Sequence, residues 1–371
     1  MIFSTTKANL LDFLSLVNPL LPAHSTKPIT ECVLLDLKEN TLTITATDLT
    51  VTLVSDIEVN GVENGVVAIH GKRFYSIIKE LPEATISIKQ ENSVVKIICG
   101  TIKFEIVITE DYSDFPTVPA KINASKMVLD SLKLKKYLSK TMYAVSNDEL
   151  RAVLTGVLLS VKHNQLIAVA TNGLTLVRLE DNSIKYEGED TELIIPAKSL
   201  QIVGNSILKN EECQIYFQDT YAEFRFAHIT IFTRLIAGKY PAYQAIIPVN
   251  NNINIKFDRE MLLNSLRRIS ISCNPLTKLL KLSLQAGQMT VSSEDNTTSS
   301  KSEEILKIDY TGEEMVIGFN SGKLVELIKN MESSFVEFFI GNAVKPVIIK
   351  PYESNESYDL ICVQMPIKIL E

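Results

Sequence analysis

The sequence contains no apolar run of about 18 residues, the length that a helix needs to cross a membrane, which excludes a transmembrane segment. Residues 1–7 lack the basic region, apolar core and small-residue cleavage site of a secretory signal. The five cysteines are far apart and form no CxxC pair, so we expect reduced, buried thiols without a disulfide framework or structural zinc. Together these absences predict a cytoplasmic protein.

Catalytic signatures are missing as well. There is no G-x-x-x-x-G-K-[ST] phosphate loop, no G-x-S-x-G elbow and no H-E-x-x-H pair. The four histidines lie in separate segments, and carboxylates such as Asp111 and Asp114 occur in loops where ordinary solvated charge explains them. We therefore predict no catalytic residue, no metal ion and no cofactor.

One strand-turn-strand pattern occurs three times. Apolar residues alternate with period two, enter a polar turn and leave it in a second alternation at residues 34–48, 157–176 and 282–295. Such alternation is typical of a β-hairpin with one buried face. A repeated hairpin predicts a repeated domain.

Independent landmarks give the same period. Pro116, Pro241 and Pro366 each follow an aromatic residue or Met, and the two intervals are 125 residues each. Lysines at 72, 198 and 323 follow an extended segment at intervals of 126 and 125 residues. This period is longer than that of solenoid repeats, so the chain is predicted to contain three copies of one domain.

Each copy is predicted to contain two amphipathic helices. The opening helices are expected at 5–17, 129–143 and 258–272, and the second helices at 71–81, 197–207 and 320–331. The remaining sequence alternates as strand, which gives an α+β fold with two helices on a mostly antiparallel sheet. The predicted domains are 1–122, 126–248 and 253–371, with boundaries in polar stretches.

Charge is divided unevenly along the chain. The formal net charge is -7, yet the six predicted helices contain 14 basic and 6 acidic residues. The helices therefore carry +8 and the remainder carries -15. One interpretation is that Lys is simply a good, well-solvated helix former. The other is that the helices line a surface facing a polyanion, since sequence-independent binding to duplex phosphate needs only such a field.

Short motifs throughout the chain resemble one family. They are Ala46-Thr47-Asp48-Leu49, Ala170-Thr171-Asn172-Gly173, Gly238-Lys239-Tyr240-Pro241, Ile317-Gly318-Phe319-Asn320 and Met365-Pro366. In this order, on a triplicated domain with basic helices, they look like the bacterial DNA polymerase III beta subunits, the replicative sliding clamps. The resemblance implies a non-catalytic processivity factor that holds a polymerase on duplex DNA.

The resemblance also implies how the chain assembles. Two chains would join head to tail into a ring, with helices inward and sheets outward. The dimer interface would use Phe104 and Ile106 of the first domain and Ile271 of the third. The DNA-facing residues would be Lys27, Lys72, Arg73, Lys79, Lys133, Lys136, Lys140, Lys198, Arg267, Arg268 and Lys323.

Partner proteins are implied to bind in one apolar pocket. The DNA polymerase III catalytic subunit, the clamp loader and other replication and repair proteins would insert a short, partly apolar peptide. Matching motifs place this pocket at Leu154, Thr171, Gly173, Leu174, Leu176, Pro241, Ile246, Val344, Pro346, Val363, Met365, Pro366 and Ile367. Taken singly, Leu154 and Leu176 also fit a core position, whereas prolines at strand edges and an adaptable Met favour a pocket.

The chain departs from the family pattern in three places. Leu174-Thr175 stands where the family often has a polar ring and an Arg, so a more apolar pocket mouth is expected. The loop 22–27, which approaches DNA in the family, has only His24 and Lys27 as basic candidates, and the chain continues past the usual ending to Glu371. The alternative interpretation is a triplicated scaffold or ligand-binding protein without DNA contact. An enzyme with a dispersed catalytic cluster is a third interpretation.

Overall fold

The computed structural model describes residues 1–369 except 23, 109–110, 119–125, 187 and 354–355. The predicted boundary at 119–125, Ala23 of the loop 22–27, and the C-terminal residues Leu370 and Glu371 therefore lie outside the described residues. The chain forms two compact units. Unit 1 is Met1–Leu134 with Lys198–Leu235, and unit 2 is Lys135–Ala197 with Ile236–Glu371.

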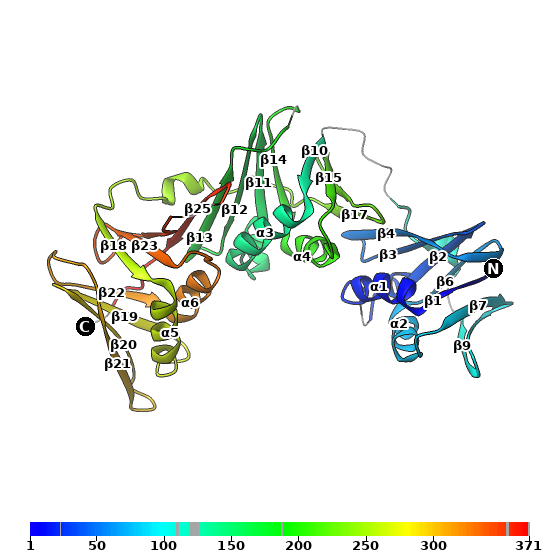
Figure 1. Ribbon diagram of the computed structural model, residues 1–371, viewed down its shortest axis with the longest axis horizontal. Helices are drawn as coiled ribbons and strands as arrows, with labels where there is room; N and C mark the ends of the chain where they lie inside the picture. The colour runs from blue at the N-terminus through cyan, green and yellow to red at the C-terminus, as the bar shows by residue number, and fades with distance from the viewer. Residues whose placement is uncertain (23, 109–110, 119–125, 187, 354–355, 370–371) are drawn as a thin grey trace. The chain divides into compact units, whose positions relative to one another are not determined.

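Unit 1 contains two antiparallel sheets (Figure 1). Sheet A has the order β5 (Asn60–Glu63), β1 (Ile2–Thr6), β7 (Thr85–Glu91), β8 (Val94–Cys99) and β9 (Ile102–Val107). Sheet B has the order β10 (Lys126–Asp130), β15 (Glu212–Phe217), β16 (Tyr221–Arg225), β17 (Ile229–Arg234), β4 (Val51–Glu58), β3 (Thr41–Thr47), β2 (Cys32–Lys38) and β6 (Gly65–His70).

Unit 2 also contains two antiparallel sheets. Sheet C has the order β14 (Thr191–Pro196), β11 (Gly156–Lys162), β12 (Gln165–Thr171), β13 (Thr175–Asp181), β25 (Asp359–Gln364), β24 (Val347–Pro351), β23 (Phe335–Ile340) and β18 (Ile253–Asp258). Sheet D has the order β21 (Ser300–Lys307), β20 (Gln288–Asp295), β19 (Leu279–Gln285) and β22 (Met315–Asn320).

All six predicted helices form, with ends shifted by at most three residues. They are α1 (Lys7–Val17), α2 (Gly71–Glu80), α3 (Ser131–Thr141), α4 (Ala197–Ser206), α5 (Arg259–Ser270) and α6 (Ser321–Lys329). Side-chain caps fix where they begin, since Thr6, Asp258 and Asn320 each accept a hydrogen bond from the backbone N–H three residues later. None of the helices in the described part of the chain is long and apolar enough to cross a membrane.

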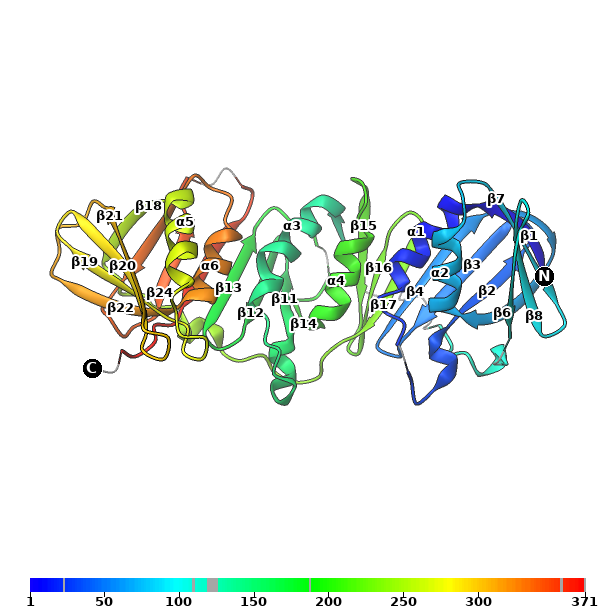
Figure 2. The ribbon, with the colours of Figure 1, turned by 90° about the horizontal axis from the view of Figure 1, so that it is seen from below.

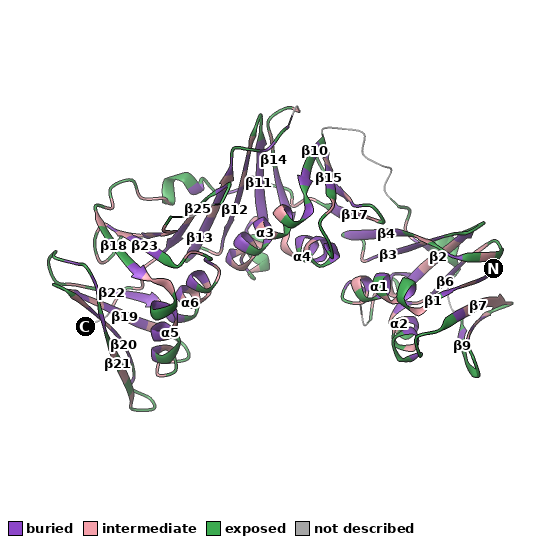
Figure 3. Ribbon diagram, in the orientation of Figure 1, coloured by how far each residue is buried: buried purple, intermediate pink, exposed green. Residues whose placement is uncertain are grey.

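Apolar side chains lie between helices and sheets within each unit. The α1 helix buries Leu10, Phe13, Leu14 and Val17, and packs beside α2 on the strands of unit 1 (Figure 2). The α5 helix packs beside α6 in the same way in unit 2. Buried residues dominate the strands and one side of each helix, while the loops are largely exposed (Figure 3).

The three predicted hairpins are confirmed as β2–β3, β11–β12 and β19–β20. The prediction for 157–176 was wrong at its end, because the second strand stops at Thr171 and a new strand begins at Thr175. The Asn172 side-chain oxygen accepts from the N–H groups of Leu174 and Thr175 at 3.0 Å each. Together with the positive φ of Gly173 (+92°), this side chain turns the chain out of the strand.

Two sheets contain strands from two predicted domains each. Strand β17 pairs with β4 in sheet B, and β25 pairs with β13 in sheet C. The range 126–248 is consequently divided between units 1 and 2. The domain bounds at 122–126 and 248–253 stay predictions.

Candidate functional site

The turn after β12 is built from side chain to backbone hydrogen bonds. The buried Thr171 hydroxyl donates to the Thr175 carbonyl at 2.8 Å and accepts from the Gly173 N–H at 3.1 Å. The turn after β3 has the same bonds, since the Thr47 hydroxyl donates to the Val51 carbonyl at 2.9 Å and accepts from the Leu49 N–H at 3.0 Å. The predicted repeat therefore extends to individual hydrogen bonds.

The end of a neighbouring strand, β25 or β17, is hydrogen-bonded to each turn at the same position. Met365 N–H donates to the Leu174 carbonyl at 2.8 Å, and Arg234 N–H donates to the Thr50 carbonyl at 2.9 Å. Gln364 adds a side-chain bond to the Leu174 carbonyl at 3.1 Å. The two junctions thus have the same backbone hydrogen bonds but different side chains, because Met365 occupies the position that Arg234 has in the other copy.

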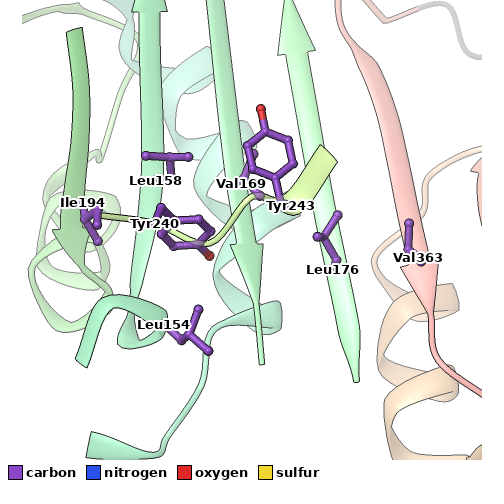
Figure 4. Packing of buried hydrophobic residues seen from close by; sticks show 8 residues of the cluster. All are labelled: Leu154, Leu158, Val169, Leu176, Ile194, Tyr240, Tyr243 and Val363. Carbon is purple, nitrogen blue, oxygen red and sulfur yellow. The ribbon is translucent and has the colours of Figure 1, made fainter. Parts of the chain in front are cut away.

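A cluster of buried apolar side chains lies beneath the turn after β12 (Figure 4). Three predicted pocket residues, Leu154, Leu176 and Val363, are at most 7 % exposed and belong to this cluster with Leu158, Val169, Ile194, Tyr240 and Tyr243. Thr171 is also buried. These four residues support the site from below and offer almost no surface to a partner.

Other predicted pocket residues are accessible. Ile246, Pro346 and Met365 line an open cavity of about 460 Å³ together with Pro248, Val249 and Lys345. Leu174 and Val344 are exposed. Gly173 and Pro241 are exposed as well, whereas Pro366 and Ile367 are half-buried. Ile367 N–H donates to the Gly318 carbonyl of β22 at 2.7 Å, which fixes the segment after Met365.

Sequence reasoning missed part of this cavity. Pro248 and Val249 line it, and Val249 is 92 % exposed, but the segment looked like a polar domain boundary because Asn250, Asn251 and Asn252 follow. The only local signal was the Pro-Val pair itself. Tyr240 and Tyr243, which pack in the cluster, precede and follow Pro241 and were likewise not singled out as supports.

The predicted DNA-facing residues separate into three groups. Lys27, Lys72, Arg73, Lys79 and Arg267 form no ion pair with any other residue that the structure describes. Three others are held by carboxylates: Lys198 by Asp48 at 2.5 Å, Arg268 by Glu304 at 2.6 Å and Lys323 by Glu326 at 3.0 Å. Lys133 is half-buried at the start of α3.

Two lysines of α3 do not offer free charge. The side chain of Lys140 is 5 % exposed, and its ammonium donates to Glu332 at 2.6 Å and to the Asn330 carbonyl at 2.8 Å. Lys136 pairs with Glu356 and with Glu332 at 3.2 Å. The hydrogen bond from Lys140 holds the pKa of Glu332 below its usual value, although burial acts in the opposite direction. Lys140 was therefore wrongly assigned to the DNA-facing surface, because a charge this buried must be paired.

The predicted dimer residues lie on an edge strand and at the end of a helix. Phe104 is on β9, the last strand of sheet A, and is 39 % exposed, while Ile271 follows α5 and is 85 % exposed. Ile106 is only 1 % exposed and packs within its own unit. Phe104 is thus the accessible apolar residue of this strand face, and the assignment of Phe104, Ile106 and Ile271 to a dimer interface stays a prediction.

No group of three or more His, Cys, Asp or Glu in the described ranges is placed to hold a metal ion. The described arrangement instead offers an apolar cavity, separate cations on helices and edge strands such as β9 and β21. Such features suit binding of a peptide, a polyanion and another sheet edge.

Comparison with known proteins gives full-length matches. Curated relatives named "Beta sliding clamp" include those of Chlamydia muridarum, 26 % identical over 99 % of both chains, and Pseudomonas putida, 27 % identical over 99 % of this chain and all of the relative. The solved DNA polymerase III subunit beta of Pseudomonas aeruginosa has a TM-score of 0.93 at 24 % identity, with both chains fully covered. The structure from Thermotoga maritima has a TM-score of 0.92 at 21 % identity, with the same coverage.

Models of three protein domains match consecutive parts of the sequence. The N-terminal domain of the DNA polymerase III beta subunit matches residues 1–119, the central domain matches 128–242 and the C-terminal domain matches 244–367. The matches follow the family's order and cover almost the whole chain, so this protein belongs to the DNA polymerase III beta subunit family, the bacterial sliding clamps.

Proposed function

We propose that two copies of this chain close head to tail around duplex DNA in the cytoplasm, and that the cavity beside Met365 receives a peptide of each partner protein. As a beta subunit, the chain is a non-catalytic processivity factor that binds DNA and the polymerase. The alternative of a scaffold without DNA contact does not agree with this family membership.

One observation carries the proposal of a closed ring. The repeats join twice by the same strand pairing, β17 with β4 and β25 with β13, while β9 and β21 are left at the ends of sheets A and D. A chain whose repeats join head to tail can continue the same junction into a second chain and close. Bare strand edges otherwise invite uncontrolled association.

The ring predicts a distinctive dependence on DNA topology. The chain should sediment at twice its own mass, and after loading it should stay on nicked circular DNA but slide off linear DNA with open ends. Sedimentation and gel filtration of loaded circles, before and after linearisation, measure both properties. A monomeric chain, or equal retention on circles and open linear DNA, would contradict the proposed ring.

The proposed DNA surface is the set of predicted cations that remain available. Lys72, Arg73 and Lys79 are on α2, Lys27 is in the loop that follows α1, and Arg267 is on α5. Lys198, Arg268 and Lys323 can join by exchanging a carboxylate for a phosphate. Lys133, at the start of α3, belongs to the same proposed surface. Weak, mobile contacts of this kind suit a sliding ring, since topology and not affinity retains it.

Removal of the two most exposed charges of α2 should weaken DNA binding in a salt-dependent way. Arg73→Ala with Lys79→Ala should reduce the slope of log affinity against log salt by about 2, because each phosphate contact contributes about 0.9. Equilibrium binding to a short duplex between about 50 and 200 mM salt measures the slope. Lys140→Met is the matched control and should leave the slope unchanged, since this lysine is buried against Glu332. If the control reduced the slope of log affinity against log salt equally, Lys140 would belong to the DNA surface and its exclusion would be wrong.

A further inference from the structure

A second open cavity lies within unit 1. Its volume is about 460 Å³, and it is bounded by α1, the C-terminal end of β4, the segment after α4 and the start of β17. All of its lining residues belong to unit 1, and none of them lines the cavity beside Met365. A cavity of this volume suits a small molecule, whereas a stable protein interface needs a much larger surface.

Four carboxylates line this cavity. They belong to Asp12, Asp56, Glu58 and Glu211. The Thr43 hydroxyl donates to Asp56 at 2.6 Å, and the Ala227 N–H donates to Glu211 at 3.1 Å, which fixes these two side chains. Asp12 and Glu58 form no ion pair with another residue that the structure describes. Lys209 is the one Lys or Arg of the lining, so the cavity has an excess of three negative charges while His228 is neutral.

Unit 2 has a smaller cavity of about 290 Å³ at the matching place. Counting from the residue before each helix relates Leu16 of the unit 1 cavity to Lys140, and Leu208 to Glu332. Strand pairing likewise relates Ile229 to Leu360. The two cavities are therefore copies of one feature of the repeat, with different side chains.

The unit 2 copy contains its own cations. Lys140 pairs with Glu332 at 2.6 Å, and Lys136 pairs with Glu332 at 3.2 Å. The corresponding positions of α1 hold Leu16 and Asp12. The unit 1 cavity is thus lined by carboxylates but has neither of the two ammonium groups that its copy receives from a helix.

Apolar side chains lie among the carboxylates of unit 1. Phe13, Leu16 and Phe226 line the cavity, and Leu208 is 72 % exposed. No three His, Cys, Asp or Glu residues in the described ranges are close enough together to hold one metal ion. A small inorganic cation would also leave Leu208 in water. The lining instead fits several cationic groups that are joined by an aliphatic chain.

We propose that this cavity binds a linear aliphatic polyamine. Its ammonium groups pair with Asp12, Glu58 and Glu211, and its methylene chain packs on Leu208 and Phe226. Aliphatic amino groups are protonated at neutral pH, so a triamine balances the excess of three negative charges. Hydrogen bonds between ammonium and carboxylate groups are among the stronger ones in proteins. The proposal does not depend on the ring, because every residue belongs to one unit of one chain.

Equilibrium dialysis of the whole chain against labelled spermidine tests the proposal. Salt at about 0.1 M screens diffuse attraction beyond about 10 Å, so about one equivalent should bind per wild-type chain. Asp12→Lys supplies from α1 the ammonium group that Lys136 supplies from α3. This variant should bind spermidine about tenfold more weakly or worse, the effect of losing one charge-assisted hydrogen bond.

Two further variants separate charge from contact. Glu80→Lys makes the same charge change at an exposed position of α2 in the same unit, outside the cavity, and should leave spermidine affinity unchanged. Leu208→Ser keeps the charge and should weaken binding severalfold, because the methylene chain loses apolar contact. Circular dichroism should show that all variants are folded.

Four outcomes would overturn the proposal. One is that wild type retains no spermidine. The second is that Glu80→Lys weakens binding as much as Asp12→Lys does, and the third is that Mg²⁺ displaces spermidine at constant ionic strength; either would indicate a diffuse counterion layer. The fourth is that N-acetyl-lysyl-leucine amide binds more tightly than spermidine, which would assign the cavity to a lysine side chain of a partner protein.

Discussion

Phe104→Asp should convert the dimer into monomers. About 39 % of the Phe104 side chain is exposed in the single chain. A fully buried aromatic side chain removes roughly 200 Å² from water. Covering the exposed part of the Phe104 side chain at the interface therefore contributes about 2 kcal/mol, at about 25 cal/mol per Å². A ring of two chains contains this contact twice, so the loss is roughly 4 kcal/mol, or about a thousandfold in the dissociation constant. The desolvation of a carboxylate at the same place adds to this loss.

A second residue of the same sheet provides the control. Val62 lies on β5, at the opposite end of sheet A from β9, and is 78 % exposed. Val62→Asp introduces the same charge at an edge that the proposed junction does not use, so its dimer should resemble wild type in sedimentation equilibrium. Circular dichroism should show that both variants are folded. If Phe104→Asp remained dimeric, or both variants dissociated alike, β9 would not be the joining edge.

Much of the fold could be predicted because its signals are local. The period-two alternation at 34–48 and the three-residue spacing between a cap and the N–H it accepts are properties of neighbouring residues. Each of these patterns occurs in all three repeats, which supports its interpretation. The alternation of apolar residues continues through Leu174 and Leu176, but Asn172 and Gly173 favour a turn. The side-chain hydrogen bonds of Thr171 and Asn172 end the strand there.

Burial of single side chains was harder to predict because it depends on distant sequence. Lys140 has the spacing of an exposed helix residue, but Glu332, 192 positions later, pairs with it. Phe104 and Ile106 are two residues apart on β9 and so lie on the same face, yet Ile106 is buried and Phe104 is exposed. Neither fact leaves a trace in the residues nearby.

The partner site shows the same division. The backbone of the turn at Thr171 is duplicated at Thr47, so the repeat alone explains it. The apolar side chains at Leu174 and Met365 are not duplicated, since Thr50 and Arg234 occupy those positions in the first copy. The difference between copies was readable from sequence. The contribution of Val249 was not, because it comes from a connecting segment outside the repeat pattern.

Ile246→Asp should remove most of the binding of partner proteins while the ring stays intact. Ile246 is 37 % exposed, lines the cavity beside Met365 and lies at the end of a short turn of helix, Tyr243–Ile246. An apolar peptide side chain placed there would have to desolvate the new carboxylate. A loss of about 2 kcal/mol, as for a residue at the centre of an interface, corresponds to about a thirtyfold weaker affinity. Titration calorimetry against the DNA polymerase III catalytic subunit measures it directly.

Val128→Asp is the matched control for this experiment. Val128 is also 37 % exposed and belongs to β10 at the edge of sheet B, remote in sequence from every cavity residue. It should leave polymerase affinity and primer extension on a singly primed circle unchanged. Ile246→Leu should retain affinity, because the apolar surface is kept. Equal affinity of Ile246→Asp and wild type would remove this cavity from the partner site. A loss of affinity together with dissociation of the dimer would mean that Ile246 acts through folding and not through contact, since the proposed dimer edges, β9 and β21, do not include it.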